Sequence, residues 1–306
     1  MTPETITSAQ NPKVKQLLAL QEKSRLRRET GLFVVEGARE LGHCLEAGFE
    51  VDSVFICPEI LDNSSSAPGR GTPPSGVRPS GSPHHPFGTV PPLPNRGWYV
   101  LKGEYPSLGD ARVFEVSKEI YAKVAYREGT EGIIAEVRTR NLRLEDLELG
   151  ENPLIAVLES VEKPGNLGAV LRSADAAGVD AVVICDPLTD LFNPNLIRAS
   201  IGAIFSVPCI ACTSEEAISW LQAKGISILT AQLQDSSLYY DADMTRGTAI
   251  VMGTEATGLT DAWREAATAH IRIPMLGRLD SLNVSVSAAI LLFEAVRQRN
   301  GKTADR

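Results

Sequence analysis

The 306-residue sequence has no apolar run that is long enough to cross a membrane, and its N-terminus lacks the apolar core of a secretory signal. A membrane-spanning helix needs about 20 consecutive apolar residues, whereas a signal peptide needs a shorter apolar stretch behind a basic start. Neither pattern is present. We therefore expect a cytoplasmic protein with no membrane partner.

Cysteine and histidine are also scarce, with five and four residues respectively. An odd and scattered set of cysteines is not a disulfide framework. Cys209 and Cys212 have C-x-x-C spacing, which raises the alternatives of a redox pair or a zinc site. A structural zinc needs about four ligands, and no second such pair exists. We therefore predict no metal site and interpret the two cysteines as small residues near a buried strand.

Three widespread enzyme motifs are absent as well. The sequence has no G-x-G-x-x-G after an expected strand, no G-x-x-x-x-G-K-[ST] and no G-x-S-x-G. The first two motifs cradle nucleotide phosphates and the third presents a nucleophilic serine. Their absence argues against a standard dinucleotide-binding domain, a P-loop kinase and a serine hydrolase.

Acidic residues outnumber basic ones, and the formal net charge is −8. Such a chain does not coat nucleic acid non-specifically. The exception is residues 12–28, which hold six basic groups and one acidic group. The segment is a candidate phosphate-binding surface, and a solvated helix face explains it equally well on charge alone. The candidate phosphate-contacting residues are Lys13, Lys15, Arg25, Arg27 and Arg28.

Residues 64–94 interrupt the expected elements, because 20 of these 31 residues are Pro, Gly or Ser. A segment of this composition cannot bury enough apolar surface to order itself. We predict a disordered insertion over 62–97 within a loop of the first domain. A Pro-rich ligand for a partner protein is the alternative, but no clean P-x-x-P motif with flanking signals occurs.

The other N-terminal residues predict a small α/β module. Asn11 followed by Pro12 is typical of a helix start, and Gly48 is typical of a helix stop. The expected elements are a helix from Pro12, helices over 38–47 and 117–124, and strands over 31–37, 51–57, 113–116 and 132–137. The charged residues 141–152 have the composition of a linker, so we place one domain at 1–147 and a second at 148–306.

In the second domain, expected strands and helices alternate. The strands are 154–158, 181–185, 226–230, 248–252 and 270–273. The helices are 167–177, 194–200, 214–224, 260–267 and 284–299, and Gly178 is a natural C-cap for the first of them. This alternation predicts an α/β fold in which a mostly parallel sheet has helices on both faces.

Polar residues and glycines follow three of these strands. The first junction is 163–168 and precedes a helix that carries Arg172, and the second junction is 253–259. The third junction is 274–283 and ends in Ser281, Leu282 and Asn283, immediately before the last helix. Because ligands bind outside the carboxyl ends of parallel strands, we predict that these junctions form one binding crevice.

Each junction also has a purely structural interpretation. Arg172 falls opposite the apolar face of its expected helix, where it could contact a ligand or pair with an acidic neighbour. Asn166 and Glu255 could cap the helices that follow them, and Ser281 and Asn283 could cap the last helix. Spacing alone leaves these alternatives open.

Taken together, the junctions resemble the three motifs of the SpoU-type (TrmH-like) RNA ribose 2′-O-methyltransferases of the SPOUT class. The matching segments are N-L-G-A-V-L-R at 166–172, M-G-T-E-A-T-G-L at 252–259, and I-P-M-L-G to S-L-N-V-S-V-S-A-A over 273–289. In addition, N-P-K-V-K at 11–15 and F-V-V-E-G at 33–37 resemble the ribosomal-protein-like RNA-binding domain that precedes the catalytic domain in many members. The likeness covers nearly the whole chain except the insertion, and it favours the functional interpretation of the junctions.

The resemblance implies a deep trefoil knot in the C-terminal domain, S-adenosylmethionine bound in the knot, and a homodimer. By motif, the residues that would hold the cofactor are Gly253, Ile273, Met275 and Leu282. The residues that would line the reacting centre are Asn166, Arg172, Glu255, Ser281 and Asn283. The five basic residues of the 12–28 segment would contact RNA.

The implied reaction is methyl transfer to a ribose 2′-hydroxyl of structured RNA, with ribosomal RNA favoured over tRNA because of the N-terminal domain. Arg172 is a poor base near neutral pH, since an arginine has a pKa above about 12. We therefore expect it to grip a phosphate and favour the developing alkoxide. A base-modifying enzyme and an inactive RNA-binding protein on the same fold are the alternatives, and Arg172, Glu255 and Asn283 argue against the inactive one.

Overall fold

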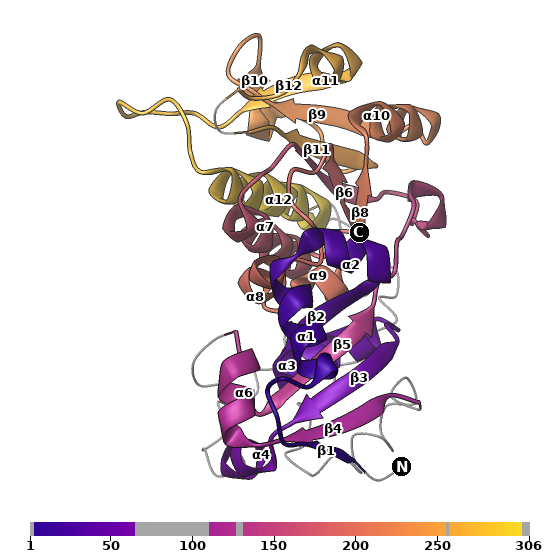
Figure 1. The fold of residues 1–306 in the computed structure, drawn as a ribbon. Coiled ribbons are helices and arrows are strands. Elements are labelled where there is room, and N and C mark those ends of the chain that lie inside the picture. The colour runs from indigo at the N-terminus through magenta and orange to yellow at the C-terminus, as the bar shows by residue number, and fades with distance from the viewer. Residues whose placement is uncertain (1–2, 65–109, 127–130, 255–256, 302–306) are drawn as a thin grey trace. The chain divides into compact units, whose positions relative to one another are not determined.

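The computed structural model describes residues 3–64, 110–126, 131–254 and 257–301 (Figure 1). Contacts within the chain divide it into two compact units, Met1–Arg140 and Asn141–Arg306. Each unit has its own sheet and its own apolar core. The domain boundary at 147/148 stays a prediction.

The first unit contains a five-stranded sheet in the order β1-β4-β3-β5-β2. Strand β5 pairs antiparallel with β2 and β3, while β4 pairs parallel with β1 and β3. The strands are β1 (Glu4–Ile6), β2 (Leu32–Glu36), β3 (Val51–Ile56), β4 (Arg112–Val116) and β5 (Ile133–Arg138). The helices are α1 (Pro12–Glu22), α2 (Ser24–Thr30), α3 (Ala38–Glu46), α4 (Pro58–Ser64) and α6 (Lys118–Val124).

Helix α1 begins where the sequence predicts it. The Asn11 side chain accepts a hydrogen bond from the backbone N–H of Lys13, and Pro12 occupies the first helical position. The helix ends at Glu22, and a separate helix α2 follows, which the periodicity did not separate from α1. Helix α2 ends at Gly31, whose positive φ of 64° is the left-handed conformation that glycine adopts without strain.

The predicted insertion begins inside helix α4. Residues 62–64 form the last turn of that helix, so the start at residue 62 is wrong by about one turn. A helix continues there because Pro58 opens it and the apolar Ile60 packs against the core of the first unit. Residues 65–97 of the insertion lie outside the described residues.

The second unit contains a seven-stranded sheet in the order β10-β12-β9-β11-β6-β7-β8, and each pair is parallel. This confirms the predicted mostly parallel sheet. The strands are β6 (Leu154–Glu159), β7 (Ala181–Cys185), β8 (Cys209–Cys212), β9 (Ser227–Ala231), β10 (Ser237–Leu238), β11 (Thr248–Met252) and β12 (Ala269–Arg272). The helices are α7 (Pro164–Ala177), α8 (Pro194–Ser200), α9 (Ala203–Ser206), α10 (Ser214–Ala223), α11 (Asp261–Ala266) and α12 (Val284–Gly301).

Helices cover both faces of this sheet (Figure 1). Trp220 of α10 and Trp263 of α11 belong to a buried cluster with Val157, Val183 and Val251 of the central strands. Helices α7 and α12 pack against each other on the opposite face, and α8 packs against α7. Within the described residues, no helix is long and apolar enough to cross a membrane.

The structure adds elements that the sequence pattern missed. Strand β8 contains the C-x-x-C segment at one edge of the sheet, and helix α9 follows α8 directly. Both are short, at four residues each, so neither gives a hydrophobic repeat that can be recognised. A further short strand that the pattern missed is β10, which has two residues and forms the other edge of the sheet.

Candidate functional site

The three junctions lie at the carboxyl ends of three parallel strands. The first junction follows β6, the second follows β11, and the third follows β12. Strands β6 and β11 are direct neighbours, and β9 alone separates β11 from β12. Strands β7 and β8 follow β6 on one side of it, whereas the later strands lie on its other side. The first two junctions, after β6 and β11, therefore flank the topological switch point, where the order of strands reverses. This is where open α/β sheets bind their ligands.

A hydrogen bond joins the third junction to the first. The Asn283 side-chain nitrogen donates to Oδ1 of Asn166 at 3.1 Å, across 117 residues of sequence. The Asn283 Oδ1 atom accepts from the backbone N–H of Ser285 at 3.0 Å and from its hydroxyl at 2.6 Å. Asn283 therefore caps α12 and contacts the first junction at the same time, and its role in the reacting centre stays a prediction.

The first junction differs from the sequence expectation in one respect. Helix α7 begins at Pro164 with Lys163 as its N-cap, so Asn166 is the third helical residue and not the cap. A proline is favourable at the first helical position because its φ is preset and it lacks an N–H, and this moves the start forward. With its backbone inside the helix, Asn166 has its side chain available to meet Asn283. The helix ends at Gly178 in the left-handed conformation, as predicted.

Arg172 is exposed on the outer side of α7. Leu167, Val170, Leu171 and Ala174 form the buried side of the helix, as the periodicity predicts. Among the described residues, no ion pair between Arg172 and an acidic side chain is found. The guanidinium group is therefore open to a ligand, which favours the functional interpretation of this arginine over the structural one.

Close packing against α8 fixes the position of α7 near Arg172. A Cβ atom on Gly168 would lie 2.6 Å from the Cβ of Ala199 in α8, which is closer than two carbons can approach. Gly168 and Arg172 are one helical turn apart and so lie on the same side of α7. Glycine at 168 therefore allows α8 to press against α7 next to the arginine.

The second junction is a closed turn. A Cβ on Gly253 would lie 2.3 Å from the carbonyl carbon of Gly258, and Gly258 has a positive φ of 69°. The Gly258 N–H donates to the carbonyl of Thr254 at 3.0 Å, and the Thr257 N–H donates to the Thr254 hydroxyl at 3.0 Å. Both glycines are therefore required by the backbone. Glu255 lies outside the described residues.

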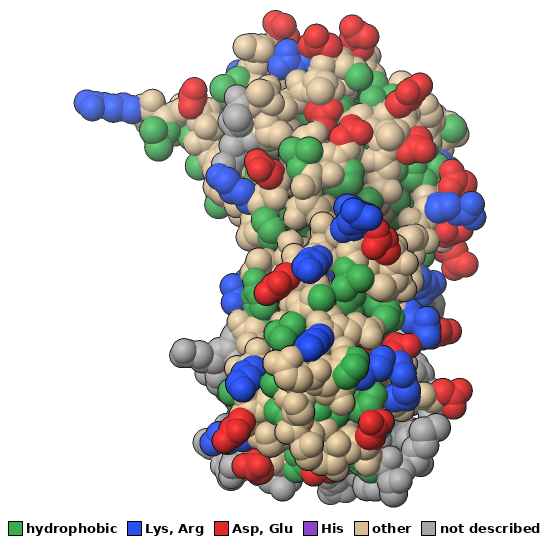
Figure 2. All heavy atoms as spheres, viewed as in Figure 1, with side chains coloured by type: hydrophobic (Ala, Val, Ile, Leu, Met, Phe, Trp, Pro, Cys, Tyr) green, Lys and Arg blue, Asp and Glu red, His purple; other side chains and the backbone are tan. Residues whose placement is uncertain are grey.

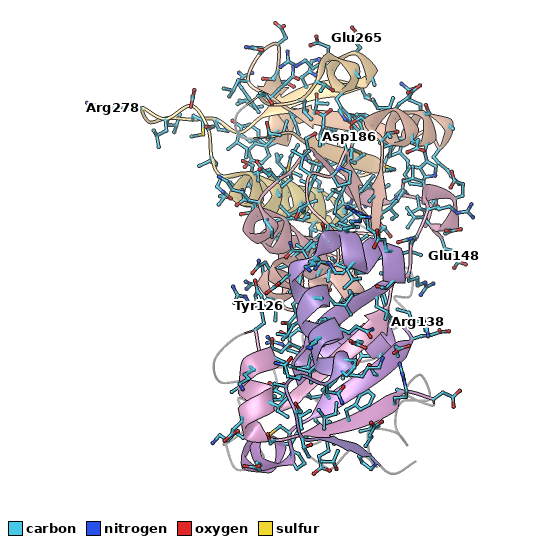
Figure 3. All side chains as sticks on the ribbon, viewed as in Figure 1. Tyr126, Arg138, Glu148, Asp186, Glu265 and Arg278 are labelled. Atoms are coloured by element: carbon cyan, nitrogen blue, oxygen red, sulfur yellow. The ribbon has the colours of Figure 1, made fainter. Side chains whose placement is uncertain are left out.

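The third junction borders a cavity. The loop extends away from the rest of the unit (Figure 1), and Arg278 lies at its far end (Figure 3). A cavity of about 380 Å³ opens at the base of this loop, within the size range of small-molecule sites. Its lining residues are Leu233, Arg272, Ile273, Pro274, Met275, Gly277, Arg278, Leu279 and Asp280.

The cavity contains two of the four predicted cofactor residues. Ile273 and Met275 line it, whereas Gly253 and Leu282 do not. Sequence reasoning missed Leu233 and Arg272, which also line it. Leu233 follows β9, the strand between β11 and β12. The position of Leu233 after a strand could have indicated that it lies near the site. No polar residues or glycines mark this segment as they mark the three junctions.

Ser281 does not cap α12, because Asn283 occupies that position. Its hydroxyl is exposed and donates to Oδ1 of the adjacent Asp280 at 3.3 Å. Ser281 is thus held only within its own loop, two residues before the Asn283 contact with Asn166. The alternative that Ser281 is a helix cap is wrong, since the Asn283 side chain already accepts the N–H of Ser285 in the first turn of α12.

The C-x-x-C cysteines do not form a reactive pair with each other. Cys212 lies opposite Cys185 in the register of β8 and β7. The hydrogen bond with Cys212 and burial raise the pKa of the Cys185 thiol, which keeps it protonated. Within the part of the chain that the structure describes, no group of His, Cys, Asp or Glu has the arrangement of a metal site.

One member of the basic segment is a structural residue. Arg27 is only 3 % exposed, and its guanidinium donates to the carbonyls of Leu20 and Gln21 at the end of α1. The prediction that Arg27 contacts phosphate is therefore wrong. The helix breaks at Lys23 between α1 and α2, and the Arg27 guanidinium then satisfies two of the last carbonyls of α1.

The other basic side chains of the segment differ in their partners. Lys15 and Arg28 are exposed, and Lys13 is half-buried and donates to Gln16 at 3.3 Å. Arg25 forms an exposed ion pair with Glu29 at 2.6 Å. Figure 2 shows Lys and Arg side chains beside acidic ones on this face, without an unbroken basic patch.

Comparisons with known proteins agree with this geometry. Residues 153–293 match the family model described as the SpoU rRNA Methylase family, and residues 11–78 match the MRM3-like substrate binding domain. The 23S rRNA (guanosine-2′-O-)-methyltransferase RlmB of Vibrio parahaemolyticus is 38% identical over 217 residues, which are 66% of this chain and 88% of that protein.

Solved structures extend the likeness to almost the whole chain. A crystal structure of an RNA 2′-O ribose methyltransferase has a TM-score of 0.71 and 34% identity, and the alignment covers 98% of this chain and 100% of that one. An AdoMet-bound rRNA methyltransferase from Sinorhizobium meliloti has a TM-score of 0.77 and 26% identity, with 96% and 97% covered.

Proposed function

The chain belongs to the SpoU rRNA methylase family, and we propose that it methylates a ribose 2′-hydroxyl of ribosomal RNA with the first and third junctions as its reacting centre. It is an RNA 2′-O-methyltransferase that uses S-adenosylmethionine. The observation that carries the site assignment is the 3.1 Å contact between Asn283 and Asn166, which brings together two motifs that are far apart in the sequence.

The described residues fit the cofactor in two respects. The cavity has a suitable volume, and its lining includes the apolar side chains of Leu233, Ile273 and Met275. At Gly253 a side chain is excluded, so a ligand there would meet backbone groups. We assign Gly253, Ile273, Met275 and Leu282 to the cofactor. When bound, S-adenosylmethionine supplies a methyl group that is activated by its positively charged sulfur.

In this mechanism the chain aligns the ribose with the cofactor and favours loss of the 2′-hydroxyl proton to solvent as the methyl group is transferred. The exposed guanidinium of Arg172 grips the phosphate next to the target ribose and stabilises the negative charge that develops on the 2′-oxygen. Asn166 and Asn283 hold the two junctions at a fixed separation, and the exposed hydroxyl of Ser281 orients the ribose. Glu255 completes the proposed set. Precise alignment of this kind provides much of the rate of a transfer reaction.

The first unit is the proposed RNA-binding part of the chain. Its family match to a substrate binding domain supports this role. We assign RNA contacts to Lys13, Lys15, Arg25 and Arg28, which leaves out the buried Arg27. A ribosomal-protein-like ancestry of this unit, a trefoil knot in the second unit and a cytoplasmic location belong to the same proposal.

A homodimer is also part of the proposal. Val286 and Phe293 of α12 are 46% and 47% exposed, although they are large apolar side chains. Exposed apolar groups on a helix are typical of surfaces that a partner covers. A second copy of this chain is the proposed occupant, and the molar mass of the protein in solution tests it.

The function is tested by methyl transfer from labelled S-adenosylmethionine to bacterial RNA that lacks the modification. Ribosomal RNA and tRNA are separated after the reaction and digested to nucleosides. The expected result is label in a 2′-O-methyl nucleoside of ribosomal RNA. Label in tRNA would change the substrate class from ribosomal RNA to tRNA, and label on a base would overturn ribose transfer. A protein that binds the cofactor but labels no RNA or ribosomal subunit would be a binding protein.

A further inference from the structure

A buried carboxylate lies beside the proposed site but belongs to none of the three motifs. Glu159 is the last residue of β6 and is only 2% exposed. Its Oε2 atom accepts the backbone N–H of Thr260 at 2.9 Å, and its Oε1 atom accepts the Thr260 hydroxyl at 2.7 Å. Burying a carboxylate is unfavourable unless hydrogen bonds satisfy it, so this pair of contacts is a strong constraint on where Thr260 lies.

A second polar group completes the cluster around Glu159. The Ser214 hydroxyl lies 3.2 Å from Oε1 of Glu159 and 2.7 Å from Oδ2 of Asp186, which is labelled in Figure 3. Ser214 has one hydroxyl proton, so it can donate to one of these carboxylates at a time. Trp263 of α11 donates to the Ser214 oxygen at 3.0 Å. Thr260 is therefore the partner on which Glu159 mainly depends.

Thr260 is the point where the second junction ends and α11 begins. The other end of the junction is Gly253, which packs directly on the backbone of Gly258. The turn is thus closed on itself, and Glu159 attaches it to β6. Because β6 leads directly into the first junction, one side chain ties the second junction to the first.

We propose that Glu159 is a positioning residue that holds the second junction in register with the first, through Thr260, so that both face the bound cofactor. This inference rests on the proposed function. It complements the Asn283–Asn166 hydrogen bond, which ties the third junction to the first. All three junctions are then fixed to the same strand–helix unit, β6 and α7.

A simple capping role does not explain this arrangement. Helix α10 has a capping box at its surface, in which the Thr213 hydroxyl accepts from Glu216 N–H and the Glu216 carboxylate accepts from Thr213 N–H. Helix α11 has only six residues, yet the N–H of its N-cap residue, Thr260, donates to the buried Glu159 carboxylate of β6. Because the chain caps α10 without a buried charge, capping alone does not explain why Glu159 is buried. We therefore relate its position to the second junction, which leads into Thr260.

The test uses the full-length protein and calorimetric binding of S-adenosylhomocysteine. Thr260→Val keeps the side-chain volume and removes the hydroxyl donor, and Glu159→Met removes both acceptors, so that neither the N–H nor the hydroxyl of Thr260 keeps its partner. We expect each variant to weaken binding about tenfold, as loss of a hydrogen bond to a charged group does. Thr260→Ser keeps the hydroxyl and should bind within about twofold of the parent.

The matched control is Thr245→Val. Thr245 makes the same kind of threonine–carboxylate hydrogen bond, to Asp243 at 2.6 Å, but at the amino end of β11, away from the junctions. It should leave the dissociation constant unchanged. Melting temperatures of all variants show how much of any effect is stability alone.

The outcomes separate the two proposals. If the parent binds S-adenosylhomocysteine and both Thr260→Val and Glu159→Met bind it equally well, the positioning role is overturned and the proposed function stays intact. Weaker binding in Thr245→Val to the same degree would overturn it too, because the effect would then be a general loss of stability. A parent that binds no cofactor would overturn the proposed function itself.

Discussion

At the scale of single residues, the contrast between Arg27 and Arg172 shows what decides the role of an arginine. Both arginines lie in helices and in segments that resemble family motifs or a phosphate-binding surface. Arg27 is buried, and backbone carbonyls accept hydrogen bonds from its guanidinium, whereas Arg172 is exposed on helix α7. An arginine that must hold a phosphate needs its planar donor group in solvent before the ligand arrives.

We expect Arg172→Ala to reduce kcat for methyl transfer by about 100-fold, the loss that follows removal of one group that stabilises developing charge. The melting temperature should not change, because the side chain is exposed. Single-turnover assays with saturating cofactor measure the effect. Arg143→Ala is the control, since Arg143 is an exposed arginine of the same unit that pairs with Asp146 three residues later. Activity of Arg172→Ala within a few fold of the parent would show that the assignment is wrong.

At the scale of elements, the junctions depend on how closely the backbone of one segment approaches another. Gly168 allows α8 to contact α7, and Gly253 allows the second junction to close. Neither requirement comes from backbone dihedral angles, since the φ of both residues is outside the left-handed region. The glycines are needed because a single methyl group would overlap a neighbouring backbone.

We expect Gly253→Ala to destabilise the protein by roughly 1–3 kcal/mol, because an added methyl group must displace the backbone of Gly258. The same displacement moves the second junction, so binding of S-adenosylhomocysteine should weaken as well. Chemical denaturation and calorimetry measure the two effects. Gly165→Ala is the matched control, because a Cβ there meets nothing within 4 Å. A Gly253→Ala protein with the stability and affinity of the parent would contradict the close approach.

At the scale of the whole molecule, the last turn of α12 attaches the C-terminal helix to the beginning of the second unit. Arg299 donates to the carbonyls of Asn152 at 2.7 Å, Pro153 at 3.2 Å, Met244 at 2.9 Å and Arg246 at 2.7 Å. Burial lowers the pKa of the Arg299 guanidinium, although it remains far above neutral pH. Conventional helix-end charge would explain an arginine here, but not four carbonyl partners from two other segments.

We expect Arg299→Ala to lower the free energy of unfolding by roughly 2–4 kcal/mol, since carbonyls from two segments lose a charged donor together. Arg297→Ala is the control, because Arg297 is exposed and pairs with Glu294 three residues earlier. Its effect should stay below about 1 kcal/mol. Urea denaturation of both variants measures the difference, and equal losses would show that Arg299 is an ordinary surface arginine.

The sequence by itself determined the local features of this protein. The alternation of apolar runs and amphipathic stretches predicted β6, α7, β7, β11 and α12, because periodicity depends on near neighbours in the chain. Cap residues such as Asn11 and Gly178 act within one helical turn and were predicted for the same reason. The three motifs, and with them the family, were likewise present in the order of residues.

Only the tertiary structure decided which distant residues meet. The contact between Asn166 and Asn283, the burial of Arg27 and the attachment of Thr260 to Glu159 depend on the order of strands in the sheet and on how helices pack. Leu233 reaches the cavity because β9 lies between β11 and β12, which no local pattern specifies. The free energy of these contacts is gained only after the chain has closed long loops, so it leaves no periodic signal in the sequence.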